Sequence, residues 1–274
     1  MDIYSEITEF YQNVQTKKTV IGKSCFHRSI YAVKVGAGSP VGLVQYAIHG
    51  REYITAKLAM KHYAVGAVGT LWLVPLTNPD GALLSQVGLD SVESAAARKR
   101  LLAWNDGNEN FSLWKANGRG VDLNVNFDAH WGEGVKNTKT RGAENAIGAA
   151  PFSEPETRAL KRFTEKIRPD YTVSYHTKGE EIYWYFYQSM RICPRDKRLA
   201  LALSAATGYP LAYAKGSVGG YKDWCIQKLQ IPSFTVEAGA DTFCHPLTEE
   251  ALFDITEKNK YAITRLAKEF QQIQ

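Results

Sequence analysis

The chain has 274 residues, 45% of them hydrophobic, and a formal net charge of +5 at pH 7. This length and apolar content allow a sizeable packed core and exclude an intrinsically disordered chain. The basic residues are spread along the chain without a long run, so the sequence gives little support to nucleic-acid binding.

No segment has the features of an export signal or a membrane span. Residues 1–30 are polar and amphipathic, and no stretch approaches about 18 consecutive apolar residues. The four cysteines are scattered without a C-x-x-C pair, which favours neither a cysteine-based metal site nor a disulfide scaffold. We therefore expect a cytoplasmic protein that does not insert into membranes, and the sequence does not indicate its oligomeric state.

Strand-like and helix-like segments alternate in the first part of the chain. Leu43–Ile48 is a short apolar run that predicts a strand, and Tyr53–Val65 carries apolar residues at helical spacing. Thr70–Leu76 predicts another buried strand, and the sequence Asn-Pro-Asp-Gly at 78–81 predicts a turn. A strand therefore leads into a helix at His49, which follows the first of these segments.

The second half of the chain continues this alternation. Ser153 stands three residues before Glu156, a capping pattern that predicts a helix ending near Pro169. The aromatic run at 183–187 predicts a strand, and the spacing from Thr248 onward predicts an amphipathic helix with a threonine cap. Because no linker or repeat interrupts the pattern, residues 1–274 are interpreted as a single α/β domain.

Two further predicted strands end at polar residues. Tyr171–Tyr175 is followed by His176, and Ile231–Val236 is followed by Glu237. In open α/β sheets, ligands bind beyond the carboxyl ends of the strands. We therefore expect His49, His176 and Glu237 to converge on one crevice.

The residue types at these positions suit zinc. His49 and Glu52 are three positions apart, so one helical turn can direct an imidazole and a carboxylate toward one point. His176 is the best candidate for a third ligand. A catalytic zinc keeps three protein ligands and leaves one position for water. Glu237, at the end of an apolar strand, is the candidate general base for that water.

Seven sequence blocks resemble the metallocarboxypeptidase family, also called funnelins, in family order and over nearly the whole chain. The blocks are IGKSCFHRSIYAVKVG, HGRE, PLTNPDG, WKANGRGVDLNVNFDAHWG, PFSEPET, SYHTKG and GGYKDWCIQKLQIPSFTVEAG. The resemblance implies a mixed, twisted sheet of about eight strands flanked by helices. It also implies one zinc ion per chain, held by His49, Glu52 and His176, with Glu237 as general base and acid.

The chain departs from the digestive members of the family at two positions. Where those members have an arginine that helps to bind the substrate's terminal carboxylate, this chain has Val125 after Asn124. Preference for a free C-terminal carboxylate should therefore weaken or be supplied by residues elsewhere. The arginine that polarises the scissile carbonyl is replaced by Lys115, with Arg119 as the alternative for that role.

The family's specificity position falls at Lys222, in an alignment without gaps as far as Glu237. A lysine there suggests an acidic substrate side chain. The family's mobile tyrosine falls at Lys215, and Tyr213 lies two residues away. Tyr213 and Tyr221 are further candidate substrate-binding residues.

Bacterial members that cleave the γ-D-glutamyl bond to a diamino acid in cell-wall peptides are similar at these positions. They share the WKAN and RGVDLN sequences and lack the arginine after the asparagine. The resemblance therefore implies a peptidoglycan peptide as substrate, with Asn124 and Lys222 orienting its carboxylates. Arg51, Lys115 or Arg119 would reach the α-carboxylate of the D-glutamate.

Two other functions stay open from the sequence. A zinc carboxypeptidase that removes acidic C-terminal residues would use Lys222 at the base of its pocket. A non-enzymatic cell-wall-binding or regulatory module would have lost a metal ligand or the base, but all four residues are present. Among the remaining histidines, His62 is interpreted as a packing or surface residue and His130 as part of an aromatic turn, and no motif surrounds His245.

Overall fold

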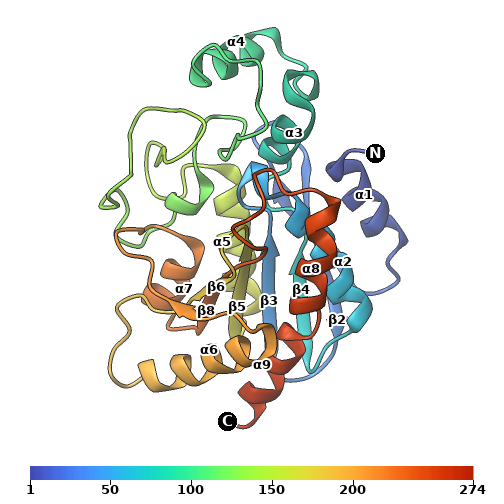
Figure 1. The fold of residues 1–274 in the computed structure, drawn as a ribbon, viewed down its shortest axis with the longest axis vertical. Helices are drawn as coiled ribbons and strands as arrows, with labels where there is room; N and C mark the ends of the chain where they lie inside the picture. Colours follow the sequence, from blue (N-terminus) through green and yellow to red (C-terminus); the bar gives the residue numbers. More distant parts are fainter. Residues whose placement is uncertain (274) are drawn as a thin grey trace.

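Within residues 1–273, which the computed structural model describes, eight strands form one mixed sheet (Figure 1). Their order across the sheet is β1-β2-β4-β3-β5-β8-β6-β7. The strands are β1 (Lys18–Lys23), β2 (Ser29–Gly36), β3 (Val41–Tyr46), β4 (Thr70–Val74), β5 (Tyr171–His176), β6 (Glu181–Tyr183), β7 (Leu211–Ala212) and β8 (Ser233–Glu237). The predicted fold class, an α/β domain with about eight strands, is confirmed.

The four central strands, β4, β3, β5 and β8, run parallel to one another. They are almost entirely buried, as expected for central strands that are covered on both faces. The pairs β1–β2, β2–β4 and β6–β8 are antiparallel. Because the central strands are parallel, their carboxyl ends meet at one edge, where His176 is level with Glu237.

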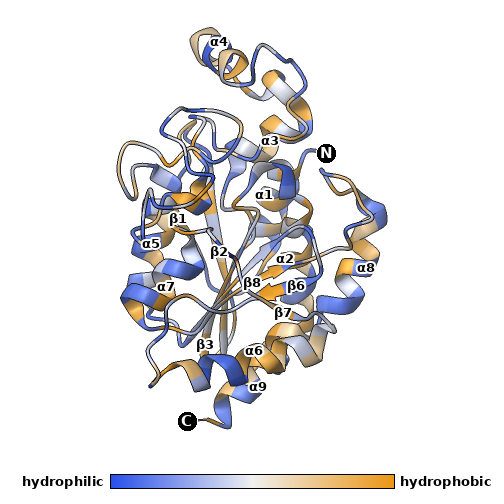
Figure 2. Ribbon diagram, turned by 60° about the vertical axis from the view of Figure 1, so that its left-hand side comes forward, coloured by the Kyte–Doolittle hydropathy of each residue, from blue (hydrophilic) through white to orange (hydrophobic). Residues whose placement is uncertain are grey.

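Helices cover both faces of the sheet. They are α1 (Ile3–Asn13), α2 (Ile54–Val65), α3 (Pro79–Val87), α4 (Ala95–Trp104), α5 (Pro155–Ile167), α6 (Cys193–Thr207), α7 (Tyr221–Leu229), α8 (Glu249–Asn259) and α9 (Ala262–Gln271). One core cluster joins α2, α6, α8 and α9 to the strands, and a second joins α5 and α7 to the opposite face. Figure 2 shows hydrophilic residues along the outer sides of α7 and α8. No helix among residues 1–273 is both long and apolar enough to span a bilayer.

His62 belongs to the core on α2. Its Nδ1 lies 2.6 Å from the hydroxyl of Tyr46, and its Nε2 lies 3.0 Å from the carbonyl oxygen of Asn259. Burial lowers the pKa of His62 to about 4, so the ring packs as a neutral group. The contact with Asn259 also gives a hydrogen-bond partner to the carbonyl of the last residue of α8, which has none within the helix.

Two helix starts differ from the sequence prediction. Residues 78–81 begin α3 and are not a turn, because Asn78 accepts a hydrogen bond from the Gly81 N–H at 2.9 Å and Pro79 occupies the first helical position. The same residue types favour both turns and helix starts. The N-cap of α5 is Glu154 and not Ser153, whose hydroxyl instead donates to the Glu154 carboxylate.

Two other predicted elements are shorter than expected. The aromatic run at 183–187 is a strand only as far as Tyr183, and Tyr187 has a φ of 51°, which no strand permits. The amphipathic pattern from Thr248 is divided between α8 and α9 at Lys260 and Tyr261. The periodicity continues across this break because both helices pack against the same core cluster.

The segment 105–154 connects α4 to α5 with only one short 3-10 helix, η3 (Leu123–Val125). Buried amide side chains hold it in place. Asn117 donates to the carboxylates of Glu154 and Glu156, and Asn126 donates to the carbonyl oxygen of Ile147 at 2.8 Å. A long irregular segment that is fixed in this way is typical of a functional loop.

Candidate metal centre

His49 and Glu52 project from the same side of a single 3-10 turn. His49 is the N-cap of η1 (Gly50–Glu52), which follows β3. A 3-10 helix has three residues per turn, so side chains at i and i+3 lie over one another. Gly50 lets this turn approach the neighbouring loop, because a Cβ there would lie 2.7 Å from the carbonyl oxygen of Trp114. The Gly50 N–H donates to the carbonyl oxygen of Lys115 at 2.9 Å, which fixes the turn against that loop.

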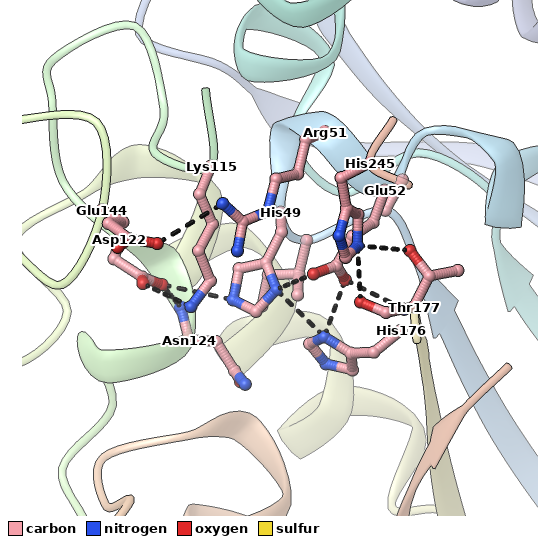
Figure 3. A network of polar contacts seen from close by, with 12 residues as sticks. His49, Arg51, Glu52, Lys115, Asp122, Asn124, Glu144, His176, Thr177 and His245 are labelled. Atoms are coloured by element: carbon pink, nitrogen blue, oxygen red, sulfur yellow. Dashed lines mark hydrogen bonds and ion pairs between the residues drawn. The ribbon is translucent and has the colours of Figure 1, made fainter. Parts of the chain in front are cut away.

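His176, the last residue of β5, completes a triangle of ligand-type atoms (Figure 3). Its Nδ1 lies 3.1 Å from His49 Nδ1 and 3.0 Å from Glu52 Oε2. His49 Nδ1 lies 2.8 Å from Glu52 Oε1. All three residues are at most 5% exposed. The structure therefore brings the three predicted metal ligands together in a buried position.

This donor set fits a zinc ion. The two ring nitrogens face each other at 3.1 Å and cannot both carry a proton without repulsion. At least one of them is therefore unprotonated, and its lone pair can bind a metal ion. Two imidazole nitrogens and one carboxylate are a ligand set of catalytic zinc sites. The three residues can therefore hold a metal ion and leave a coordination position free.

Asp122, which the sequence did not single out, links the metal group to Lys115. Its Oδ1 lies 3.3 Å from His49 Nε2, and its Oδ2 lies 3.1 Å from Lys115 Nζ. Burial alone would raise the pKa of Asp122, but Lys115 and His49 outweigh burial and hold it well below its usual range. An anionic partner on the far nitrogen fixes the orientation of a ligating histidine. The sequence signals were an acid between the apolar residues Val121 and Leu123 and its place in the RGVDLN sequence at 119–124.

Glu237 ends β8 beside His176 and lines a cavity of about 550 Å³. Burial raises the pKa of Glu237 to about 7, and the carboxylate of Glu52 adds to this, while His176 and Lys115 oppose it. A pKa near neutrality suits a group that accepts a proton and later returns it. The position of Glu237 is thus compatible with a general base beside the metal group.

Lys115 and Arg51 bring positive charge to the same cavity. Burial opposes the charge of Lys115, but the carboxylates of Asp122 and Glu52 outweigh burial and raise the pKa of the ammonium. Arg51 Nη1 lies 3.4 Å from Glu144 Oε2 at the more exposed side (Figure 3). Both cations can therefore stabilise negative charge in the cavity.

Asn124 and Lys222 line the cavity together with Val125. Asn124 Oδ1 accepts a hydrogen bond from the backbone N–H of Tyr221 at 3.1 Å, which leaves the amide NH₂ group for a ligand. Lys222 Nζ lies 2.5 Å from Asp223 Oδ1. The apolar Val125 provides no clamp for a terminal carboxylate.

Two candidate residues lie away from the cavity. The side chain of Arg119 is exposed and does not line the cavity, so Lys115 is the better placed of the two candidates for carbonyl polarisation. Tyr221 is fully buried, and its hydroxyl lies 2.8 Å from Thr164 Oγ1. Its ring packs against Phe127 in the core, which corrects its assignment as a substrate-binding side chain.

Tyr213 and Lys215 both line the cavity, and Tyr213 is 60% exposed. His130 lies outside it, paired with Glu133 at 2.8 Å. His245, which no sequence motif marked, lies close to the metal group. Its Nε2 is 3.0 Å from the carbonyl oxygen of Thr177, the residue that follows His176 (Figure 3).

A second group of ligand-type side chains, Cys25, Asp80 and Glu156, lies elsewhere. The carboxylate of Asp80 already accepts hydrogen bonds from Arg28 at 2.7 Å and from Ser24 at 2.9 Å. Burial and the nearby acids raise the pKa of the Cys25 thiol, so it stays protonated and donates to Asp80. This group is therefore a structural hydrogen-bond cluster.

The chain is similar to known proteins of one family. Residues 68–262 match the family model described as zinc carboxypeptidase. A curated relative, the gamma-D-glutamyl-L-diamino acid endopeptidase 1 of Lysinibacillus sphaericus, is 34% identical over 84% of this chain and 62% of its own length. The murein peptide amidase A of Escherichia coli (strain K12) is 34% identical over 45% of this chain and 50% of its own length. The chain thus spans less than two thirds of either relative in these alignments.

The fold also matches solved structures. The structure of bovine thrombin-activatable fibrinolysis inhibitor, in complex with tick carboxypeptidase inhibitor, aligns with a TM-score of 0.77 and 20% identity. The alignment covers 100% of this chain and 98% of that one. At this identity the likeness establishes the fold alone.

Proposed function

The chain belongs to the zinc carboxypeptidase family, and from that premise we propose that it is a zinc-dependent peptidase that hydrolyses the γ-D-glutamyl bond to a diamino acid in peptidoglycan peptides. The observation that carries this proposal is the buried convergence of His49, Glu52 and His176 beside Glu237 at one cavity. The names of the two curated relatives support a cell-wall peptide as substrate. A cytoplasmic location stays a prediction from the sequence.

The chemistry follows from the positions of the side chains. One zinc ion, held by His49, Glu52 and His176, would supply a Lewis acid for the scissile carbonyl and for water. Glu237 takes a proton from the attacking water and passes it to the leaving amine, as its pKa of about 7 allows. Lys115 stabilises the developing oxyanion with its ammonium group.

The charges of the cavity support an anionic substrate. Five cationic side chains and four acidic ones line it, and the charge of zinc would add to the positive side. The cations are Arg51, Lys115, Lys136, Lys215 and Lys222, and the acids are Asp122, Glu144, Asp223 and Glu237. In this proposal Asn124 and Lys222 orient the carboxylates of the diamino acid, and Arg51 reaches the α-carboxylate of the D-glutamate.

Val125 supports cleavage at a γ-D-glutamyl bond in preference to trimming of ordinary C-termini. The side chain of Val125, which lines the cavity, cannot form the bidentate hydrogen bonds with a free α-carboxylate that an arginine at that position would form. The alternative, a carboxypeptidase for acidic C-terminal residues, would depend on Lys222 alone for its preference.

A panel of defined peptides tests the proposal. Zinc-loaded protein is incubated with L-Ala-γ-D-Glu-meso-diaminopimelate and with an ordinary peptide that ends in glutamate, and the products are identified by mass spectrometry. We expect release of diaminopimelate from the first peptide and little change in the second. Release of the C-terminal glutamate alone would establish the alternative.

A further inference from the structure

Lys222 and Asp223 form an ion pair in the buried wall of the cavity, in the first turn of α7. Lys222 Nζ lies 2.5 Å from Asp223 Oδ1, and each side chain is only 7% exposed. Both residues line the cavity together with Glu237. Opposite charges are therefore presented side by side to any substrate side chain that enters.

The pair keeps hydrogen-bonding capacity for a ligand. The Lys222 ammonium donates to Asp223 and to the carbonyl oxygen of Tyr185 at 3.2 Å, which leaves one of its three N–H groups. Asp223 Oδ2 accepts from the backbone N–H of Gly220 at 3.0 Å, and Oδ1 accepts only from Lys222. One donor and one acceptor thus remain available beside each other.

Building on the function proposed above, we propose that Lys222 and Asp223 together bind a zwitterion, the distal amino acid centre of a diaminopimelate-type residue. The distal carboxylate binds Lys222, and the distal ammonium binds Asp223. Asp223 is then a second specificity-determining residue, and Lys222 is one half of a paired site.

Charge matching explains why both groups are needed. A side chain with only a carboxylate would place it next to Asp223, and one with only an ammonium would place it next to Lys222. Because both protein groups are buried, water screens such like-charge contacts weakly. A zwitterion gives each protein charge a partner, so the pair selects against both simpler side chains.

A purely structural role for Asp223 makes a different prediction. Asp223 also caps the start of α7 through Gly220. The substitution Asp223→Asn keeps an oxygen for this bond and removes only the negative charge. If Asp223 acts only as a helix cap, Asp223→Asn should change kcat/KM by the same factor for every substrate. If Asp223 binds the distal ammonium, the substitution should change the preference among substrates.

The test uses three γ-D-glutamyl substrates that differ only at the distal centre. They carry meso-diaminopimelate, L-lysine, which lacks the distal carboxylate, or 2-aminopimelate, which lacks the distal amine. We measure kcat/KM for the zinc-loaded wild type, Asp223→Asn and the control Asp128→Asn. Asp128 is an exposed acid that lies outside the cavity and pairs with Lys228.

The wild type should prefer the diaminopimelate substrate at least tenfold over each of the others. Asp223→Asn should shift the ratio of diaminopimelate to 2-aminopimelate at least tenfold toward 2-aminopimelate, and Asp128→Asn should not. Wild-type rates within threefold for all three substrates would overturn the inference and leave the proposed function intact. Equal losses on all substrates in Asp223→Asn would also overturn it. Cleavage of none of the three by the wild type would overturn both proposals.

Discussion

His176 and Glu237 stand level with each other at the ends of the adjacent parallel strands β5 and β8. Sheet hydrogen bonds, and not a flexible loop, therefore set the distance between a ligand-type histidine and the candidate base. Sites built on strands hold their geometry better than sites on loops. A conservative change at Glu237 should consequently alter the chemistry without displacing the metal group.

The substitution Glu237→Gln tests the role of the base. We expect it to lower kcat by about 10³-fold, the scale for loss of a general base, with one zinc ion per chain retained. Steady-state kinetics and metal analysis of the same preparation measure both quantities. Turnover within about tenfold of the wild type would remove Glu237 from the mechanism.

Asp122→Asn should weaken zinc binding because it removes the anionic partner of His49 Nε2. Loss of such a partner costs about 10- to 100-fold in metal affinity. Competition with a chelator of known affinity measures the change, and Asp128→Asn is a matched control outside the site. Equal zinc affinity in wild type and Asp122→Asn would show that Asp122 does not support the metal group.

Lys115 and Arg119 were alternatives for carbonyl polarisation, and the cavity favours Lys115. Lys115→Met should lower kcat by about 10²-fold, the scale for removal of one oxyanion partner. Arg119→Met should leave kcat near the wild-type value. The reverse result would assign the role to Arg119, which would then have to enter the cavity on substrate binding.

The stability of the protein should depend on the protonation of Glu156. Burial raises the pKa of Glu156 to about 7, and the carboxylate of Asp80 contributes. Because the folded state holds this proton more tightly than the unfolded state, the stabilisation is present below pH of about 4.5 and is lost as pH rises to about 7. The full effect is about 3 kcal/mol.

Denaturant unfolding between pH 5 and 8 checks this prediction. Relative to the wild type, Glu156→Gln should gain free energy of unfolding as the pH rises. The control Glu165→Gln changes a partly exposed acid that pairs with Lys161, and its curve should stay parallel to the wild type. A constant difference between wild type and Glu156→Gln across this range would contradict the raised pKa.

Much of the central sheet could be predicted from the sequence. Thr70–Leu76 is almost continuously apolar, and Tyr171–Tyr175 adds only the small hydroxyl residues Thr172 and Ser174, because parallel central strands are buried on both faces. His176, which follows Tyr171–Tyr175, and Glu237, which follows the strand predicted at Ile231–Val236, mark the edge where ligands bind. The sequence therefore predicted which residues form the metal group, but it did not predict the distances between their side chains.

The segment 105–154 was less predictable, because its shape depends on amide and carboxylate contacts between distant residues. The role of Asp122 depends on such contacts with His49 and Lys115. Tyr221 and Lys222 are adjacent in sequence, yet the turn of α7 directs the first into the core and the second to the cavity. The sequence alone did not show that only Lys222 of these two residues lines the cavity.

Anomalous diffraction at the zinc absorption edge, from crystals of protein purified without chelator, would locate a zinc ion in the protein directly. We expect one strong anomalous peak between His49 Nδ1, the Glu52 carboxylate and His176 Nδ1. An absent peak at that position, or a zinc peak at Cys25, Asp80 and Glu156 instead, would contradict it.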